Sequence, residues 1–519
     1  MRKNKKYRNH NRNSAQKLFG LNIKEYGWST AALNIKEKMP SLVSLKIIMN
    51  ENDFLALKEE WNSLVQKSSA TIYQTFEWLY CWWKYFGGGN QYTLHIVLVY
   101  LESDIVKSQE ILVEKIDGDS KRLIGIAPFY IHNRSFAGYR IYKQIRLIGS
   151  GLHSGQSGSN AIEQEGLSDY LDIISAREYE DRTAEALTSY FSAFKYFFDE
   201  IDLQNISNDS FIFTKLLPLL QKNEFNIEMK RSDICPRLNV PESFDNFITA
   251  VKSNTRRRLK QALKNVEDGS SCRIEDVNLK SFVSSFQSLR QLHQKRWNEI
   301  GYPGLFTDER VGKFQNEVNN EFLKRGWLWF KILRVDHKII AARLGFKFNN
   351  RVYDYLSGFD SVPSSASLRP GLILILDMIK DAVGWSLQVV DFLRGAEEYK
   401  FELSSTVGYN YHVIIKHPES LPKLKAALIK AIEFRSYMLH RIKNERSIIL
   451  LHAKRYGKVL FVRSYLKFCF KRLQTYTSRS KGNVKRKEKI FMIQQYDAKQ
   501  VDDRIKEKKH KLHEIEIDI

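Results

Sequence analysis

Residues 391–400 read Asp391-Phe392-Leu393-Arg394-Gly395-Ala396-Glu397-Glu398-Tyr399-Lys400. They overlap the end of the apolar run Gln388–Phe392, which predicts a strand whose end carries these charged side chains. Upstream, Ser367-Leu368-Arg369-Pro370-Gly371 comes directly before an aliphatic segment. Because proline favours the first turn of a helix, this order predicts a helix over 370–383.

Short strands and longer helices alternate on both sides of this stretch. In the first half the pattern predicts strands at Ser44–Ile48, Tyr92–Leu101, Arg122–Tyr130, Gln144–Ile148, Leu171–Ile174 and Glu200–Leu203, and helices at Asp53–Gln66, Thr75–Phe86 and Ala184–Phe198. In the second half it predicts helices at Phe244–Ala250, Arg256–Val266, Leu279–Ile300 and Val311–Arg325, and strands at Trp327–Val335, Lys338–Phe348 and Arg351–Phe359. We therefore expect an α+β protein of two similar halves, each with helices packed on a mostly antiparallel sheet.

The charge of the chain lies at its ends. The 519 residues carry a formal net charge of +23, of which residues 1–24 contribute +8, residues 416–480 contribute +13 and residues 481–519 contribute +3. The middle is therefore close to neutral, which argues against a body built to track a nucleic acid. The four cysteines show no metal-ligand spacing, and neither a secretory signal nor a membrane-spanning run is present. These features predict a cytoplasmic protein.

Composition also predicts the domain organisation. Residues 1–40 read as a basic flexible leader, 41–235 and 236–415 as the two folded domains, and 481–519 as a charged, partly disordered tail. Residues 416–480 space apolar residues among many basic ones, which predicts basic amphipathic helices. Such helices pack on the body or lie on an anionic membrane, and the near-neutral body favours the membrane. The protein would then be peripheral at the inner face of the membrane.

Two further stretches match a known pattern together with the strand end at Asp391. Residues 252–259 read Lys252-Ser253-Asn254-Thr255-Arg256-Arg257-Arg258-Leu259, and residues 168–172 read Ser168-Asp169-Tyr170-Leu171-Asp172. With the proline–glycine turn, they resemble the CelD-like acetyltransferases of the GNAT superfamily over roughly residues 41–405. The resemblance implies two tandem GNAT-like domains, an arrangement shared with Fem-type aminoacyltransferases. It also implies acyl transfer from a thioester such as acyl-CoA, typically in envelope or exopolysaccharide metabolism.

The donor site is predicted at the start of the 370–383 helix. An anion favours a helix N-terminus, because free backbone N–H groups and the helix dipole point toward it. Gly371 permits close approach of a phosphate, and Arg369 can add a bidentate contact. The turn departs from the ordinary acetyltransferase phosphate loop, since it has one glycine and Pro370 lacks an N–H. The resemblance adds three donor-binding candidates: Arg394, Arg256 and Arg257. The alternatives are an ordinary helix start and a solvated basic helix face.

Catalytic residues are predicted in the strand-end string. Acyl transfer needs a base for the acceptor proton and a group that stabilises the thioester oxyanion. A carboxylate at a strand end is well placed for the first task, so we predict catalytic roles for Asp391, Glu398 and Lys400, without assigning the base. The alternative is that Asp391 pairs with Arg394 as a structural element. The matching motifs contain no cysteine or serine that would act as a nucleophile, so direct attack without a metal is expected.

Two other features have a structural and a functional interpretation. His153 lies in a Gly/Ser-rich loop and is a candidate base, although a lone histidine there is more often without function. The aromatic residues Trp78, Trp82 and Trp83 share one predicted helix. Core packing is the favoured interpretation, and a surface on which a carbohydrate stacks is the alternative.

The sequence therefore predicts an acyltransferase that moves an acyl group, acetyl first among the candidates, from CoA or a carrier protein to an amine or hydroxyl of a saccharide-type precursor. Two rivals stay open. One is a Fem-type transferase that uses aminoacyl-tRNA, for which the basic ends would supply the RNA contacts. The other is a scaffold that kept the fold, lost the chemistry and binds a membrane surface through residues 416–480.

Overall fold

The structure is a computed structural model that describes residues 43–102, 121–136, 139–151, 166–195, 197–267, 272–299, 304–360 and 368–417. Its strands are β1 (Val43–Ile48), β2 (Tyr92–Glu102), β3 (Lys121–Phe136), β4 (Tyr139–Leu147), β5 (Ile174–Ser175), β6 (Glu200–Ser207), β7 (Asn226–Asn239), β8 (Cys272–Asp276), β9 (Leu328–Val335), β10 (Lys338–Phe348), β11 (Arg351–Phe359), β12 (Val389–Asp391) and β13 (Thr406–Lys416). They form one 13-stranded sheet in the order β1-β2-β3-β4-β6-β13-β7-β12-β11-β10-β9-β8, with β5 paired to β3.

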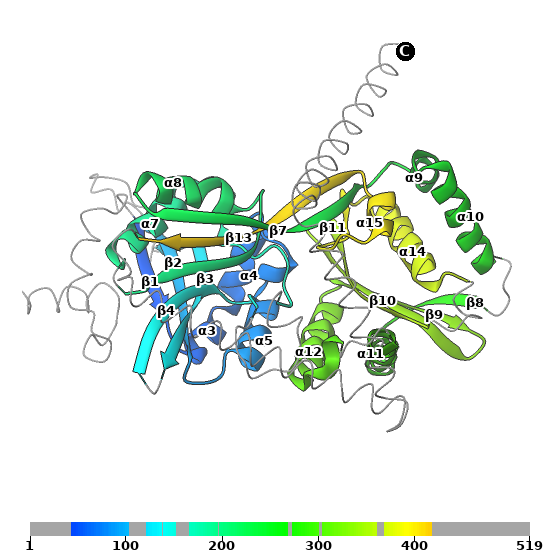
Figure 1. Ribbon diagram of the computed structural model, residues 1–519, viewed down its shortest axis with the longest axis horizontal. Coiled ribbons are helices and arrows are strands. Elements are labelled where there is room, and N and C mark those ends of the chain that lie inside the picture. Colours follow the sequence, from blue (N-terminus) through cyan, green and yellow to red (C-terminus); the bar gives the residue numbers. More distant parts are fainter. Residues whose placement is uncertain are drawn as a thin grey trace, which may run out of the picture.

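Helices cover both faces of this sheet. The first half contributes α3 (Glu51–Ala56), α4 (Lys58–Gln66), α5 (Phe76–Phe86), α7 (Glu180–Ala193) and α8 (Leu217–Lys222). The second half contributes α9 (Phe244–Ala250), α10 (Ser253–Glu267), α11 (Phe282–Glu299), α12 (Glu309–Lys324), α14 (Pro370–Gly384) and α15 (Glu398–Leu403). In the second half, α10 and α14 lie on one side of β9, β10 and β11, while α11 and α12 lie on the other (Figure 1).

The last strand of the chain joins the two halves. β13 lies between β6 and β7 and is antiparallel to both. β7 pairs with β13 along most of its length and then with β12 through Arg237–Asn239. The α+β class is confirmed, but the sheet is mixed and continuous rather than divided in two. The domain boundary predicted at 235/236 falls inside β7 and stays a prediction.

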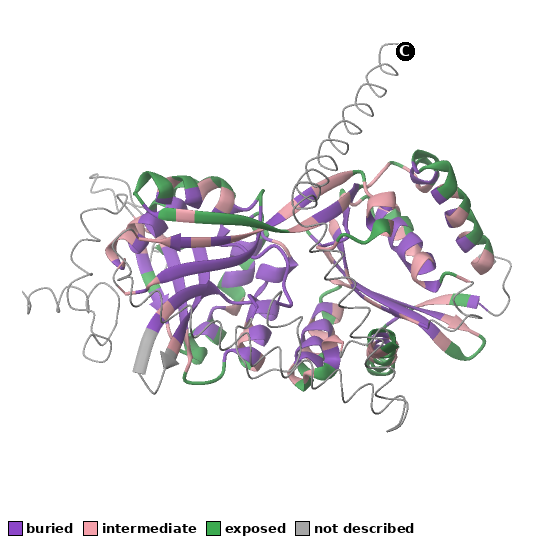
Figure 2. Cartoon of the chain, in the orientation of Figure 1, coloured by how far each residue is buried: buried purple, intermediate pink, exposed green. Residues whose placement is uncertain are grey.

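Burial follows the sheet. The central strands are buried and the outward helix faces are exposed (Figure 2). The predicted aromatic cluster on α5 is mostly core, because Trp78 and Trp82 are almost completely buried. Trp78 packs against Phe314, Phe322 and Phe346 from the second half, so it also joins the two halves. Core packing is therefore confirmed over a carbohydrate surface for these two residues.

Several predicted elements lie outside the described residues: the leader 1–40, the segment 416–480 beyond His417, the tail 481–519 and the loop with His153. Within the described part, no helix combines the length and the apolar character that crossing a membrane requires. Cys81, Cys235 and Cys272 are buried thiols without disulfide bonds.

Candidate functional site

Two parallel strand pairs interrupt the antiparallel sheet, and the second pair frames the candidate site. β11 and β12 are paired at only three positions, the last of which joins Tyr353 to Asp391. Beyond this point the chain turns onto β7, where Phe392 N–H donates to Pro236 O at 3.1 Å and Gly395 N–H donates to Ile234 O at 3.0 Å. β11 continues to Phe359. Backbone pairing between the two strands therefore ends at Tyr353 and Asp391, and we call this break in the pairing the gap.

Two of the predicted donor-site residues, Arg369 and Gly371, lie at the start of α14, near the far end of β11. α14 begins at Pro370 as predicted, after Arg369, whose backbone is left-handed with φ 57°. A Cβ added to Gly371 would lie 3.2 Å from the ring of Phe359, so the helix start packs closely on the end of β11. The Arg369 side chain is exposed. The first turn of α14 is thus held at the edge of the gap.

A buried ion pair supports this helix start from below. Arg343 on β10 lies 2.5 Å from the Asp354 carboxylate on β11, and both side chains are about 5% exposed. The second guanidinium nitrogen of Arg343 donates to Gly371 O at 3.2 Å. Neither residue was predicted from the sequence, although a charged residue inside an otherwise apolar strand was a usable signal. The pair fixes the position of the first turn of α14 relative to the sheet.

Asp391 is completely buried at the end of β12. Its Oδ1 accepts hydrogen bonds from Tyr170 Oη at 2.8 Å and from Leu393 N–H at 2.9 Å. Its Oδ2 lies 3.1 Å from Arg237 Nε. Burial raises the pKa of Asp391, and the positive charge of Arg237 opposes that shift. The carboxylate is held on every side by protein groups.

The segment Gly166–Asp172 of the first half runs along the strand end. Arg394 Nε lies 3.4 Å from Asp169 Oδ1, and another guanidinium nitrogen of Arg394 donates to Gly166 O at 2.8 Å. Tyr355 Oη on β11 donates to Leu167 O at 3.0 Å. Burial raises the pKa of Asp169 to about 6. The segment therefore contacts both walls of the gap, which brings the sequence motifs at 168–172 and 391–400 together.

The remaining residues of the strand-end string have different surroundings. Lys400 is buried, and its Nζ donates to Arg394 O at 2.7 Å and lies 3.1 Å from Glu397 Oε2. Glu398 is exposed in the first turn of α15. Among the described residues, no hydrogen bond or ion pair joins Asp391 to Glu398 or Lys400. The three predicted catalytic residues are thus close in sequence, but they do not form one contact network.

Some basic residues of α10 bond to other protein groups, and others are exposed on the surface. Arg256 donates to the carbonyls of Thr249 and Val251 at the end of α9, and Arg258 pairs with Glu402 on α15. Arg257 is exposed. A hollow of 420 Å³ on this helix is lined by Ser253, Arg256, Arg257, Lys260, Gln261 and Lys264. Asn265 Nδ2 donates to Leu368 O at 3.4 Å, which connects α10 to the residues before α14.

The first half has a matching strand pair whose gap is filled. β4 and β6 are also paired at three positions, and the last pair joins Arg146 to Asp202, a buried ion pair of 3.1 Å. Beyond it, Ser168 Oγ donates to Gly149 O at 2.9 Å, and Leu171 N–H donates to Asn205 O at 3.0 Å. The segment Gly166–Asp172 therefore occupies the space that corresponds to the second-half gap.

Comparison with known proteins identifies the second half. Residues 253–401 match the acetyltransferase (GNAT) domain family. They form a GNAT-type acyltransferase domain. This domain contains α10, the β11–β12 gap, the start of α14 and the strand-end string, and it makes the protein an acyltransferase enzyme. Comparison with curated proteins gives no match.

Solved structures similar to the whole described fold show low identity. FemX is 11% identical, with a TM-score of 0.47, and the match covers 72% of this chain and 98% of FemX. L-PGS from Bacillus licheniformis is 7% identical, with a TM-score of 0.40 and coverage of 72% and 96%. A tandem GNAT protein from the clavulanic acid biosynthesis pathway is 10% identical, with a TM-score of 0.33 and coverage of 73% and 100%. Similarity at this level gives no information on substrates.

Proposed function

We propose that the protein transfers an acyl group from acyl-CoA or an acyl carrier to an amine or hydroxyl of a saccharide-type envelope or polysaccharide precursor. Acetyl is the leading candidate for the acyl group. The observation that carries the proposal is the gap between β11 and β12, with the first turn of α14 at its edge, inside the GNAT domain. The corresponding gap of the first half is filled by its own chain. We place the donor site in the second half because a proline–glycine helix start, Pro370-Gly371 of α14, follows the strands there.

The donor is a substrate with phosphates at one end and a thioester at the other. We propose that its pyrophosphate binds at the start of α14, near Arg369 and Gly371, where helix N–H groups favour an anion. A further phosphate would reach the basic hollow of α10, with Arg256 and Arg257. The link between Asn265 and Leu368 supports this arrangement, because it places the end of α10 against the residues before α14.

In the proposed reaction, the acceptor nitrogen or oxygen attacks the thioester carbonyl and the C–S bond breaks. The thiolate of CoA leaves and takes up a proton, while a base removes the proton of the acceptor. Of the two carboxylates predicted as catalytic, Glu398 is exposed and open to an acceptor, whereas Asp391 is completely buried. We therefore propose Glu398 as the base. Asp391 and Lys400 are proposed to act through their contacts, by positioning Tyr170, Leu393 and Arg394 at the strand end.

We also propose a role for residues 416–480, which is to bind a membrane surface. Their basic amphipathic pattern supports binding to an anionic membrane surface, which would bring the enzyme close to lipid-linked acceptors. The full-length protein should sediment with anionic vesicles and lose that binding at high salt. A chain that ends at residue 417 should stay in the supernatant. Equal sedimentation of the two proteins would contradict this proposal.

The direct test of the function is transfer of labelled acetyl groups from acetyl-CoA to a set of amino and neutral saccharide precursors. The proposal expects labelled product from at least one precursor, and calorimetric binding of CoA in the absence of acceptor. No transfer together with no CoA binding would contradict it. Binding of aminoacyl-tRNA that persists at ~0.2 M salt would favour the Fem-type alternative instead.

A further inference from the structure

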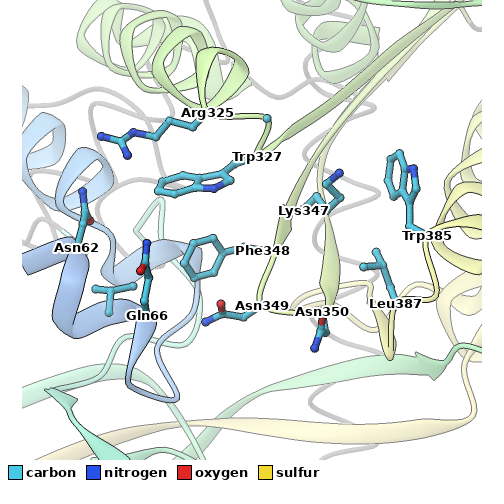
Figure 3. Close-up of a pocket in the computed structure, with 12 residues that line it drawn as sticks. Asn62, Gln66, Arg325, Trp327, Lys347, Phe348, Asn349, Asn350, Trp385 and Leu387 are labelled. Carbon is cyan, nitrogen blue, oxygen red and sulfur yellow. The ribbon is translucent and has the colours of Figure 1, made fainter.

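A second concave site lies far from the start of α14. A groove of 540 Å³ is lined by α4 of the first half, the turn between β10 and β11, and the residues that follow α12 and α14. Gln66 lies at one end of this groove and Trp385 at the other (Figure 3). α14 has 15 residues, so Trp385 at its C-terminus is about 22 Å from its first turn. The groove is therefore separate from the proposed phosphate site.

The walls of the groove are fixed before any ligand binds. Asn349 and Asn350 form the β10–β11 turn, with φ of 46° and 58°, a conformation that asparagine tolerates well. Asn349 Nδ2 donates to Ala70 O in the first half at 2.9 Å, and Gln388 N–H donates to Asn350 O at 2.8 Å. These bonds attach the turn to both neighbouring segments, which limits the entropy that a ligand would lose by ordering the site.

The groove is lined by aromatic side chains and by hydrogen-bonding groups. Trp385 is 43% exposed, an unusual exposure for so large an apolar side chain. Lys347 Nζ lies 4.3 Å from the ring centroid of Trp385, and Arg325 Cζ lies 5.0 Å from that of Trp327. The side-chain amides of Gln66 and Asn350 have no hydrogen-bond partner among the described residues.

The charge of the groove is low and positive. Arg325 is paired with Glu77 at 2.5 Å, and its charge is largely compensated. Lys347 forms no ion pair with any residue that the structure describes, and no carboxylate lines the groove. A single uncompensated ammonium group is too little for a nucleic-acid backbone, which requires several cations. The exposed amides argue against an acyl chain, because a lipid would leave them without hydrogen bonds.

We propose that this groove binds a saccharide. Pyranose rings present C–H faces that pack on an indole and hydroxyl groups that bond to amides. A saccharide of several rings can use the exposed Trp385 at one end of the groove and the amides of Asn350 and Gln66 along it. The volume lies within the roughly 300–1,000 Å³ of small-molecule sites. Lys347 would favour a saccharide that carries a carboxylate. The link to acyl transfer rests on the proposed function: the groove would hold a part of the acceptor remote from the reacting group.

Calorimetry on the full-length protein tests the inference without turnover. The probes are chitotetraose, cellotetraose, maltotetraose and a tetramer of galacturonic acid. At least one should bind the wild-type protein, and Trp385→Ala should weaken that binding by about tenfold or more, which corresponds to about 1.4 kcal/mol. Lys347→Gln should weaken the galacturonic acid tetramer more than the neutral probes.

The matched control is Trp297→Ala, since Trp297 on α11 is 40% exposed and does not line the groove. It should bind every probe as the wild type does. Failure of all four probes to bind would overturn the inference, as would equal binding by Trp385→Ala and Trp297→Ala. CoA binding is measured on the same samples. If CoA binds and no saccharide does, only this inference fails; if CoA does not bind, the proposed donor site fails.

Discussion

Tyr170 donates a hydrogen bond of 2.8 Å to Asp391, which lies 221 residues further along the chain. One residue belongs to the first half and the other ends β12 in the GNAT domain. Arg237 of β7 lies 3.1 Å from the other oxygen of the same carboxylate. Three segments from different parts of the chain therefore meet at one buried charge, and this contact fixes the strand end beside the gap.

Loss of a partner of Asp391 should destabilise the fold in proportion to the charge it leaves uncompensated. Arg237→Ala should reduce the free energy of unfolding by about 3–5 kcal/mol, because the buried carboxylate loses its cation. Tyr170→Phe removes one hydrogen bond to a charged group and should reduce it by about 1.5–3 kcal/mol. Urea unfolding followed by circular dichroism measures both. A larger effect of Tyr170→Phe than of Arg237→Ala would contradict the assigned network.

Variants of the two glutamates at the start of α15 distinguish a catalytic role from a structural one. Glu398→Gln should lower kcat by about tenfold or more and leave the urea midpoint unchanged, because Glu398 is exposed. Its neighbour Glu397, 56% exposed and in contact with Lys400, is the matched control. Glu397→Gln should keep most of kcat. If Glu397→Gln loses more activity than Glu398→Gln, the base is assigned to the wrong residue.

Residues 406–416 should be essential for folding although they follow the GNAT domain. β13 lies between β6 and β7, so its loss would expose the backbone of two strands in the middle of the sheet. A chain ending at residue 405 should be insoluble or should show no cooperative unfolding. A chain ending at residue 417 should unfold cooperatively, as the full-length protein does. Cooperative unfolding of the shorter chain would refute this sheet order.

The sequence predicted the local elements well and the long-range contacts poorly. The bounds of β10 and β11 were predicted as observed, because apolar strands flank a turn of two asparagines. The start of α14 followed from Pro370. β7 and β13 were not predicted: the first part of β7 is polar and exposed, and the pairing of these strands is non-local. The single helix predicted at 53–66 is divided at Leu57, whose N–H bonds to Phe54 and Leu55 carbonyls.

In the candidate site, too, the local motifs were predicted and most of their long-range contacts were not. The strings at 168–172 and 391–400 were each identified from the sequence, and the structure brings them into contact. The partners Arg237 and Arg343 were missed, because nothing in a one-dimensional pattern pairs a strand arginine with one particular carboxylate. The structural alternative, a pair of Asp391 with Arg394, has different partners in the structure: Asp391 pairs with Arg237, and Arg394 pairs with Asp169.

Two buried histidines should each remove stability as the pH falls below about 6.5. The raised pKa of Asp169, about 6, acts in the opposite direction, so the effect of each histidine is measured as a difference between variant and wild type. Burial lowers the pKa of His95 to about 3 and that of His293 to about 4. In the unfolded chain both take up a proton near pH 6.5, so the unfolded state binds more protons than the folded state between those values. Each such histidine should therefore remove about 1.4 kcal/mol of stability per pH unit below about 6.5. His95→Gln should give a shallower loss between pH 6 and pH 4 in urea titrations, and an unchanged slope would contradict the assignment.

CoA affinity in two glycine variants of α14 shows whether the donor binds where this helix begins. Gly371→Asp places a carboxylate at the first turn of α14, where a Cβ would lie 3.2 Å from the ring of Phe359, so Gly371→Ala is the control for that contact. Gly384→Asp places the same carboxylate at the other end, where a Cβ meets no atom within 4 Å. Isothermal calorimetry should show CoA binding weakened by about tenfold or more in Gly371→Asp, since a negative charge would occupy the phosphate position. Gly384→Asp should bind CoA as the wild type does. Equal affinities in the two variants, or a greater loss in Gly384→Asp, would show that the donor binds elsewhere.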